Sequence, residues 1–425
     1  MSTAIGQWRS VLPDELAARA VEVATEIAER MRQPLALDAV DREVIDAAVG
    51  VALLHGQLDR HLPDQGWDKA AHGHLAHAAA TAERSGTGSA AFFGGLGGLG
   101  FATWLLSHDG TRYRRLIASL DQSVIATATA RAELLSASPA GPPVQLIDVV
   151  SGLAGNGRYL LGRKDSEPAM AALRTVLAAL VAVSDSDDGR PHWHTPPQSL
   201  IPGAALAKSY PGGYLDCGLA HGVAGPMALL ALARQAGIEA PGQVEAVERM
   251  ARWLAAQRIE DEWGANWPAA IPLQGDGNGP THAAWCYGVP GVARALWLAG
   301  SAIEDAGFRE LAVSAMKTVY ARPPRARLVD YAPGLCHGTG GLLEITLRFA
   351  HDTGDPAFAE AAAELTERLL ELHEPDRPYG FRAHNDKLEK IDDPGLLDGA
   401  AGPALALLAA GTDTEPGWDG MLLLS

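Results

Sequence analysis

The stretch "HGTGGLLEITLRFA", residues 337–350, joins a cluster of glycines to an almost wholly apolar run. The same pattern, G-x-[AGP]-G followed by apolar residues, occurs six times along the chain. The first aligned glycines of the six copies are Gly95, Gly152, Gly222, Gly288, Gly338 and Gly399. Their spacing of about 50 to 70 residues suits one helical hairpin plus a loop, so the sequence predicts a repeat architecture.

Amphipathic helices are predicted between the glycine motifs, for example over residues 243–257 and 356–373, where apolar residues recur at helical spacing. Each repeat is therefore predicted to hold an outer amphipathic helix, a loop and an inner apolar helix that begins with the glycine motif. Helices that are apolar on every side must be buried. Six or seven of them, ringed by the amphipathic set, predict an all-α fold, an α/α toroid of helical hairpins. Glycine would allow close approach near the axis and a positive φ at the entry turn.

The repeats extend through most of the chain, so we expect residues 1–425 to form a single toroidal domain. Residues 1 to about 40 are expected to form a helical extension, and the first repeat is degenerate, with only the pair His55-Gly56 left of the motif. Long Gly/Pro-rich loops should gather on one rim, because each precedes an inner helix. These loops cover residues 186–216, 260–284, 321–335 and 374–395. Loops of this length are often functional, although they can also be ordinary surface connections.

The composition argues against several classes of protein. A formal net charge of −17 over 425 residues, without any cluster of Lys and Arg, does not suit nucleic-acid binding. The N-terminal residues lack the basic and apolar regions of a signal peptide, and no apolar run is long enough to cross a bilayer. We therefore expect a cytoplasmic protein without a transmembrane segment.

Two cysteines and a histidine are candidate metal ligands. Cys286 and Cys336 stand two residues before the aligned glycine in consecutive repeats, and His337 follows Cys336. Equivalent positions in adjacent repeats should face the axis at the same height, so the three side chains should converge. Two thiolates and one imidazole suit zinc, and three protein ligands with an open fourth position are typical of catalytic zinc. The alternative is a pair of core thiols with a capping histidine.

Adjacent ligands set a condition on the backbone. Neighbouring residues in a regular helix point about 100° apart, so Cys336 and His337 can share an ion only if the chain is not yet helical there. The sequence therefore predicts that the inner helix of this repeat begins after His337.

Further polar residues near the motifs are candidates for catalysis. His221 occupies the same column as His337 but has no cysteine before it, so we assign it to proton transfer; the alternative is a hydrogen-bonded core histidine. Tyr287 either orients a substrate through its hydroxyl or only fills space in the packed core. Asp148 lies in apolar surroundings, where a carboxylate needs a histidine or arginine partner. His282 is one candidate for that partner, or else an exposed loop histidine.

Three other potential ligands are not assigned to the site. Cys217, four residues before His221, is expected to be a packed thiol rather than a fourth ligand. His192 and His194 look like a metal-binding pair, but they lie in a Pro-rich loop.

The motifs "GLAHG" (218–222), "WCYG" (285–288) and "GLCHG" (334–338) together resemble the lanthionine synthetase C-like family of peptide cyclases. The likeness runs from about residue 40 to the C-terminal end and includes "DVVSGLAG" (148–155) and "GLLDGAAG" (395–402). It implies an α/α toroid with a central zinc ion. Matched position by position, the implied zinc ligands are Cys286, Cys336 and His337, and the implied active-site residues are His221, Asp148 and Tyr287.

One position departs from the family pattern. Several family members carry an arginine four residues before the first zinc cysteine, where this sequence has His282. A histidine can pair with Asp148 only when it is protonated or through a neutral hydrogen bond.

The resemblance also implies a reaction, the cyclisation of a ribosomally made peptide. A peptide cysteine would add to dehydroalanine or dehydrobutyrine in a Michael addition and form lanthionine or methyllanthionine. The implied substrate is a dehydrated precursor peptide with leader and core. A separate dehydratase must then act first, because 425 residues leave no room for a dehydratase domain. A biosynthetic complex with the dehydratase and a transporter would associate this protein peripherally with the membrane.

Two other functions remain open from the sequence. One is a zinc hydrolase, which is disfavoured because two thiolates weaken the metal as a Lewis acid and no H-E-x-x-H motif is present. The other is a non-catalytic zinc-containing scaffold that binds peptide or glutathione thiols.

Overall fold

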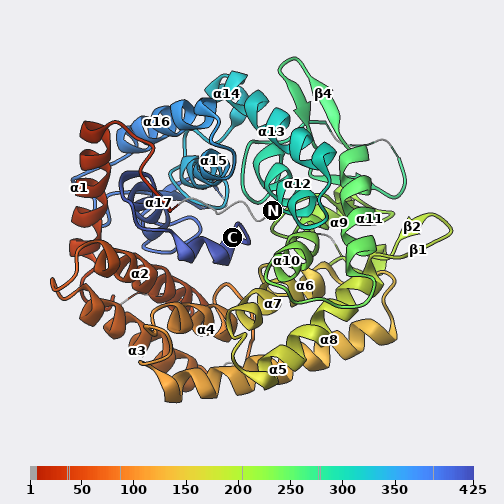
Figure 1. The fold of residues 1–425 in the computed structure, drawn as a ribbon, viewed down its shortest axis with the longest axis horizontal. Coiled ribbons are helices and arrows are strands. Elements are labelled where there is room, and N and C mark those ends of the chain that lie inside the picture. Colours follow the sequence, from red (N-terminus) through yellow and green to blue (C-terminus); the bar gives the residue numbers. More distant parts are fainter. Residues whose placement is uncertain are drawn as a thin grey trace.

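The computed structural model describes residues 7–35, 37, 39–86, 88–202, 204–275, 277, 279–385 and 387–425. Within these residues the long helices form two concentric rings (Figure 1). The inner ring holds α2 (Asp41–His61), α4 (Leu96–Leu105), α7 (Leu153–Gly162), α10 (Ala224–Gln235), α12 (Val289–Ala302), α15 (Thr339–Thr353) and α17 (Ala401–Gly411). The outer ring holds α1 (Asp14–Arg30), α3 (Trp67–Ser85), α5 (Arg114–Ala137), α8 (Glu167–Val183), α11 (Gln243–Ala256), α13 (Ala306–Ala321) and α16 (Pro356–Glu371). The predicted all-α toroid is confirmed.

The order of helices within a hairpin differs from the prediction. An inner helix packs most closely on the outer helix that follows it, as α2 does on α3 and α12 does on α13. The reason is loop length, since short turns join these pairs and the long loops come before the inner helices. Helix α1 packs on α17, so the expected N-terminal extension supplies the outer partner of the last inner helix. We propose that the chain forms one domain, because this contact closes the ring.

Helix α2 is the first inner helix, but the pair His55-Gly56 is not a remnant of the glycine motif. Both residues lie in the middle of α2 rather than at its start. The Nε2 atom of His55 lies 3.0 Å from the carbonyl oxygen of Ala28, and its side chain is fully buried. His55 is therefore a hydrogen-bonded core histidine, and that alignment was wrong.

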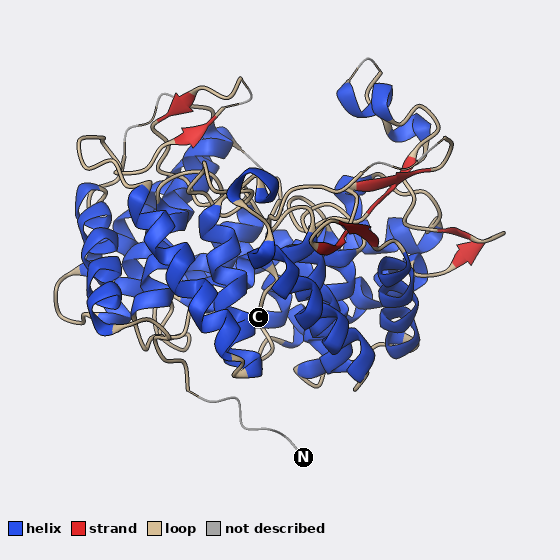
Figure 2. Cartoon of the chain, turned by 90° about the horizontal axis from the view of Figure 1, so that it is seen from above, coloured by secondary structure: helices blue, strands red, loops and turns tan. Residues whose placement is uncertain are grey.

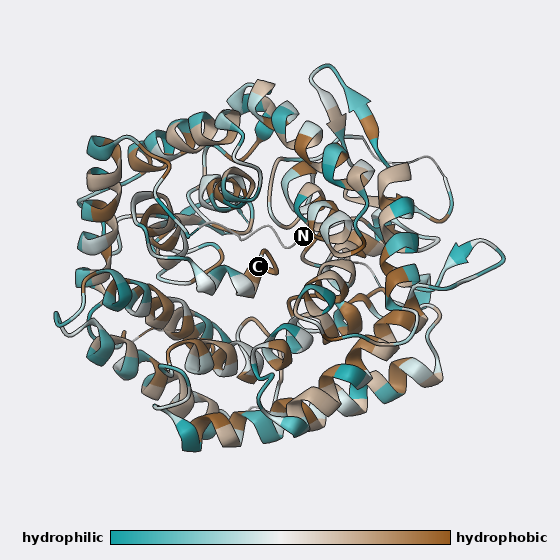
Figure 3. Cartoon of the chain, in the orientation of Figure 1, coloured by the Kyte–Doolittle hydropathy of each residue, from teal (hydrophilic) through white to brown (hydrophobic). Residues whose placement is uncertain are grey.

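Apolar residues fill the seam between the two rings. In α17 every residue from Ala401 to Ala410 is buried, as expected for an inner helix. The outer helix α11 buries Val247, Met250 and Leu254, which share one face, and exposes its opposite side. In Figure 3 hydrophilic and hydrophobic residues alternate along the outer helices, as expected for helices with one buried and one exposed face. Burial of one such side chain contributes about 1.5–3 kcal/mol, so this seam is the main source of stability.

Short elements lie in the long loops. The described residues form four two-stranded antiparallel sheets: β1 (Ser186–Asp187) with β2 (Arg190–Pro191), β3 (Tyr214–Asp216) with β6 (Ala270–Pro272), β4 (Ile259–Asp261) with β5 (Gly264–Asn266), and β7 (Ala383–His384) with β8 (Lys390–Ile391). The same part of the chain holds α6 (Val144–Ile147), α9 (Ala205–Ser209), α14 (Pro324–Arg327), η1 (Pro197–Ser199) and η2 (Gly417–Leu422). Figure 2 shows the strands and most of the long loops on one side of the helices, as predicted.

The last residues fill the middle of the ring, where Figure 1 marks the C-terminus. Leu422, Leu423 and Leu424 are fully buried. The indole Nε1 of Trp285 donates a hydrogen bond of 2.9 Å to the carbonyl oxygen of Leu422, and Nε of Arg294 donates one of 2.9 Å to that of Leu424. The segment thereby ties the start of α12 to the axis of the toroid.

The second glycine of each motif packs directly on a backbone carbonyl. A Cβ atom at Gly341 would lie 1.9 Å from the carbonyl oxygen of Leu335, far inside contact distance. The equivalent glycines in the other repeats meet the carbonyl six residues earlier in the same way; they are Gly98, Gly155, Gly225, Gly291 and Gly402. These glycines are needed because they lack a side chain, which allows the inner helix to begin against its own loop.

The first glycine of the motif does not need a left-handed backbone in most repeats. Of the six, only Gly288 has a positive φ, +90°. Gly95, Gly152 and Gly338 have φ values of −144°, −101° and −130°. The expected positive φ at the entry turn was therefore wrong for most copies, because close approach rather than handedness selects glycine there.

The carbonyl contact predicts the effect of one added methyl group. Gly341→Ala should lower the free energy of unfolding by about 1–3 kcal/mol, because α15 must shift away from its loop. Gly88→Ala is the control, since nothing lies within 4 Å of the added Cβ. Chemical denaturation of both variants measures the difference, and equal stability of the two would contradict the steric account.

Candidate metal centre

A loop closed by a backbone hydrogen bond precedes several of the inner helices, namely α4, α10, α15 and α17. In the loop before α15 the amide of Thr339 donates to the carbonyl oxygen of Ala332 at 2.8 Å, and before α10 the amide of Val223 donates to that of Asp216 at 3.1 Å. The backbone therefore stays non-helical up to the first glycine. Helix α15 begins at Thr339, so Cys336 and His337 precede it, as predicted.

Neighbouring loops are joined by backbone hydrogen bonds to one repeated position, the carbonyl two residues before the first glycine. The amide of Cys286 donates to the carbonyl oxygen of Cys336 at 3.2 Å. The same acceptor position is used in the bonds from Phe92 N to Val150 O (2.9 Å), Val149 N to Ala220 O (3.0 Å), Leu219 N to Cys286 O (3.0 Å) and Cys336 N to Leu397 O (2.9 Å), with donors two or three residues before the first glycine. Equivalent positions in consecutive repeats are therefore neighbours in space, and the two cysteines meet for this reason.

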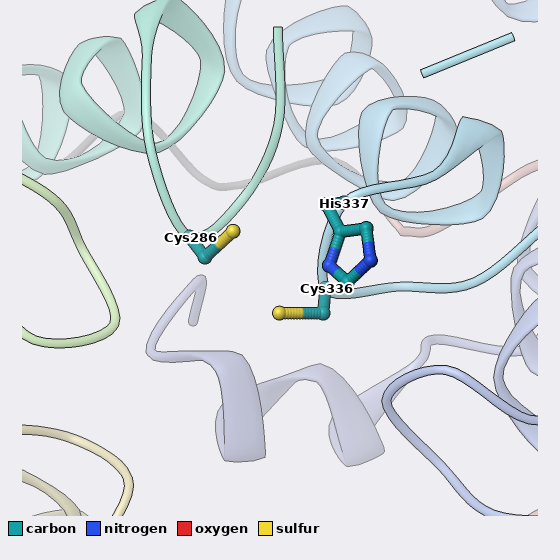
Figure 4. A group of neighbouring side chains, drawn as sticks. All are labelled: Cys286, Cys336 and His337. Carbon is teal, nitrogen blue, oxygen red and sulfur yellow. The ribbon is translucent and has the colours of Figure 1, made fainter. Parts of the chain in front are cut away.

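Three side chains converge where these loops meet (Figure 4). One donor atom from each of Cys286, Cys336 and His337 lies within 4.8 Å of the other two. Two metal–ligand bonds of about 2.3 Å span nearly this separation, so one ion between the side chains fits the donors. Cys286 is buried, and the other two are partly exposed. A cluster with one buried and two partly exposed donors leaves room for an external ligand on its exposed side.

The charges in the cluster favour a bound cation. A hydrogen bond from Cys336 lowers the pKa of Cys286 well below the ordinary thiol value; burial opposes this shift, and His282 and His337 add to it. A thiolate is the form of cysteine that binds metals. The hydrogen bond to Cys286 in turn raises the pKa of His337, although burial opposes it.

Asp398 adds a carboxylate beside the cluster. Its Oδ1 lies 3.5 Å from Nδ1 of His337. Burial raises the pKa of Asp398, and the nearby His337 opposes this shift. Asp398 precedes Gly399 in the same column as His221 and His337, so its place in the motif was visible in the sequence although no role was assigned to it.

A histidine–carboxylate pair lies close by. Nδ1 of His221 is 2.8 Å from Oδ2 of Asp148, whose side chain is fully buried. The other carboxylate oxygen, Oδ1, accepts a hydrogen bond of 2.8 Å from the amide of Ser151. Burial lowers the pKa of His221, but the hydrogen bond and the charge of Asp148 outweigh it, so the net pKa is raised. The expectation that Asp148 pairs with a histidine or an arginine is confirmed, with His221 as the partner.

Comparison with known proteins identifies the family. The family model described as "Lanthionine synthetase C-like protein" matches residues 38–423. The chain belongs to the lanthionine synthetase C-like family. It is 23% identical over 305 residues to the nisin biosynthesis protein NisC of Lactococcus lactis subsp. lactis. The alignment covers 69% of this chain and 71% of that protein. The solved structure of nisin cyclase superposes with a TM-score of 0.74 at 20% identity, over 97% of this chain and 98% of that one, which shows a shared fold.

His282, where several lanthionine synthetase C-like proteins carry arginine, does not pair with Asp148. Its Nε2 lies 3.9 Å from Sγ of Cys286, and its Nδ1 lies 3.4 Å from the hydroxyl of Thr281. The candidate pairing of His282 with Asp148 is therefore wrong, because the carboxylate of Asp148 pairs with His221 instead. His282 instead contributes to the surroundings of the first cysteine.

Tyr287 has a partner that the sequence did not suggest. Its hydroxyl donates a hydrogen bond of 3.1 Å to Oδ2 of Asp216, a residue only 7% exposed. Burial raises the pKa of Asp216 to about 6, although the Gly218 amide, His221 and Tyr287 all oppose the shift. Asp216 is a carboxylate in an apolar stretch, six residues before Gly222. This position was the feature of the sequence that could have marked it as a site residue.

The remaining candidates lie outside the metal cluster. Cys217 is 1% exposed, and burial raises its pKa well above the ordinary thiol value, as expected for a packed thiol. Nδ1 of His194 lies 2.8 Å from the carbonyl oxygen of Pro191, and Nε2 of His192 lies 3.1 Å from Asp187. Among the described residues the one His/Cys/Asp/Glu group that could hold a metal ion is Cys286, Cys336 and His337.

The cluster predicts which cysteines retain metal. Cys286→Ala and Cys336→Ala should each reduce zinc in the purified protein from about one per chain to a small fraction, because two ligands hold an ion far less tightly than three. Cys217→Ala, which removes a buried thiol outside the cluster, should keep the wild-type content. Elemental analysis after dialysis measures all three, and zinc loss from the Cys217 variant alone would refute the assignment.

Proposed function

We propose that this protein is a zinc-dependent lanthipeptide cyclase. It would catalyse the intramolecular addition of peptide cysteine thiolates to dehydroalanine or dehydrobutyrine and form lanthionine or methyllanthionine rings. Membership of the lanthionine synthetase C-like family and the shared fold with nisin cyclase support this activity. The observation that carries the proposal is the Cys286–Cys336–His337 donor set beside the His221–Asp148 pair.

The proposed metal ligands are Cys286, Cys336 and His337, and the proposed metal is zinc, which suits two thiolates and an imidazole. When bound there, zinc would lower the pKa of a substrate thiol enough for the thiolate to exist at neutral pH. Cys336 and His337 are partly exposed, so the peptide sulfur would approach from their side. Asp398 would hold the imidazole of His337 in place.

His221 is proposed as the acid that completes the addition. Its Nδ1 faces Asp148, which leaves Nε2 to exchange a proton with the peptide. In the reaction the thiolate sulfur forms a bond to the β-carbon as the carbon–carbon π bond breaks. Negative charge moves to the enolate oxygen, and a proton from Nε2 then reaches the α-carbon. The proton that the thiol releases restores the acid form of His221 directly or through solvent, so the peptide loses a free thiol and gains a thioether without a change of mass.

A separate dehydratase is proposed to supply the dehydrated precursor peptide, because the addition needs an unsaturated residue. The structure contains no helix, among the described residues, that is long and apolar enough to span a membrane. A cytoplasmic site of action, alone or in a complex with that dehydratase, completes the proposal.

Incubation with a synthetic peptide that carries one cysteine and one dehydroalanine tests the activity. Loss of the free thiol without a mass change, detected by alkylation and mass spectrometry, is the expected result. A mass gain of one water would support a hydrolase, and an unchanged peptide that stays bound would support a thiol-binding scaffold. Either of these two results would contradict the cyclase.

His221→Ala should slow cyclisation of the same peptide by about 10²- to 10⁴-fold, because a positioned acid typically contributes that much. The zinc content should stay at the wild-type level, since His221 is not among the clustered donors. Parallel rate and zinc measurements separate this result from a loss of metal, and an unchanged rate would exclude His221 as the acid.

The pH profile tests the pairing of His221 with Asp148. The acid form of His221 is present below its raised pKa, so the rate should fall as the pH rises through that value. Asp148→Asn removes the charge that raises the pKa, so the fall should move to lower pH. Rates of the two proteins across the neutral range check this direction, and a shift to higher pH would contradict it.

A further inference from the structure

Asp216 occupies the turn that leads into the loop before α10. It is the last residue of β3, and its carbonyl oxygen accepts from the amide of Val223, which closes that loop. Oδ1 of its side chain accepts a hydrogen bond of 2.8 Å from the amide of Gly218. A Cβ atom at Gly222 would lie 2.5 Å from this Oδ1, so the first motif glycine makes room for the carboxylate.

The turn itself uses only one carboxylate oxygen. Asp393 holds the equivalent position before α17, six residues ahead of Gly399, and its Oδ1 accepts a hydrogen bond of 2.7 Å from the amide of Gly395. An asparagine side chain can make the same bond through its oxygen. The structural requirement of the loop therefore does not explain the second oxygen of Asp216.

That second oxygen is directed to Tyr287. The phenol hydroxyl donates to Oδ2 of Asp216 at 3.1 Å. The ring of Tyr287 packs over Gly218, where an added Cβ atom would lie 2.7 Å from two ring carbons. Both the ring and the hydroxyl hydrogen are thus fixed by the turn that begins at Asp216. Because its hydrogen points to Asp216, the phenol oxygen can offer the substrate only its lone pairs.

We propose that Asp216 is a positioning residue of the cyclisation reaction, which holds the hydroxyl of Tyr287 as an acceptor for a backbone N–H of the bound peptide. This inference rests on the proposed function and adds to it a contact that selects the peptide's main chain next to Cys286. A backbone contact suits an enzyme that must hold a peptide in place while its sulfur and its unsaturated carbon meet.

Asp216 also acts on the charge of His221. The charged groups that face His221 are Asp148, Asp216 and Cys286, and each raises its pKa against the effect of burial. Removal of the charge at Asp216 therefore lowers the pKa of His221. Removal of the Tyr287 hydroxyl leaves that charge in place, so the two changes have different effects on the pH profile.

The test compares Asp216→Asn, Tyr287→Phe and the double variant on the synthetic cysteine–dehydroalanine peptide. In Asp216→Asn the amide oxygen keeps the bond from Gly218, and the NH2 group donates to the phenol and reverses its hydroxyl. At a pH below the alkaline fall in rate, each single variant should raise KM about ten- to a hundredfold with kcat nearly unchanged, because the lost bond is made before and during the reaction. At the same pH, where His221 is in its acid form in all the proteins, the double variant should have a KM no higher than that of either single variant.

The pH profile separates a positioning role from a structural one. The alkaline fall in rate should move to lower pH in Asp216→Asn and stay in place in Tyr287→Phe. Asp393→Asn, the same change in the equivalent turn, serves as the control for stability in thermal unfolding. Two results would overturn the proposal: an increase in KM in the double variant equal to the product of the two single increases, or an unchanged KM in Tyr287→Phe. The second result does not depend on whether Asp216→Asn folds.

A readout without substrate keeps this inference distinct from the proposed function. The ¹³Cζ NMR shift of labelled Tyr287 reports whether the hydroxyl donates or accepts. It should change in Asp216→Asn and stay constant in Asp393→Asn. If the wild-type protein cyclises the probe peptide but this shift does not change, the inference is wrong and the function stands. If the shift changes but no cyclisation occurs, the function is wrong, and with it the proposed contact to the substrate.

Discussion

The site depends on the chain of backbone hydrogen bonds that joins one motif loop to the next at the axis of the toroid. Five of the six motif loops offer the same carbonyl, two residues before the first glycine, to an amide of the preceding loop. The bond between Cys286 N and Cys336 O belongs to this chain and fixes the register of the two cysteines. A backbone bond does not depend on which side chain is present, so metal-binding residues could be introduced at this position without disturbing the ring.

The second glycine of each motif makes that arrangement sterically feasible. Its missing side chain lets the inner helix start against the carbonyl six residues earlier, as Gly341 does against Leu335. The loop before the helix can then fold back to the axis while the helix points away from it. The residues just ahead of the helix, including Cys336 and His337, are therefore held at the centre by geometry common to all six motifs. Suitable donors at two adjacent repeats, such as Cys286 and Cys336, are thereby brought together.

The sequence predicted the toroid, the rim loops and the convergence of Cys286, Cys336 and His337, because all three follow from a repeat period and from residues in aligned columns. The pairing of α1 with α17 was not predictable in this way, since helical periodicity identifies an apolar face but not the neighbour that covers it. Local spacing also misled the assignment of His282. It lies four residues before Cys286 and stays next to that residue, whereas the partner of Asp148 comes from another repeat.

The hydrogen bond between Tyr287 and Asp216 shows a second limit of sequence reasoning. The two residues are 71 positions apart and belong to different repeats. Asp216 has a structural counterpart in Asp393, so its column suggests only a turn. Its additional contact follows from the placement of Tyr287 over Gly218. This placement depends on how adjacent loops pack, and no repeated pattern in the sequence indicates it.

X-ray absorption at the zinc edge of the purified protein tests most directly whether adjacent loops build one metal site. The account predicts one zinc ion with two sulfur ligands near 2.3 Å, one nitrogen ligand near 2.0 Å and a further light atom, with a third sulfur appearing when a cysteine-containing peptide is added. A spectrum with one sulfur ligand or none would show that Cys286 and Cys336 do not share an ion, and it would contradict the account.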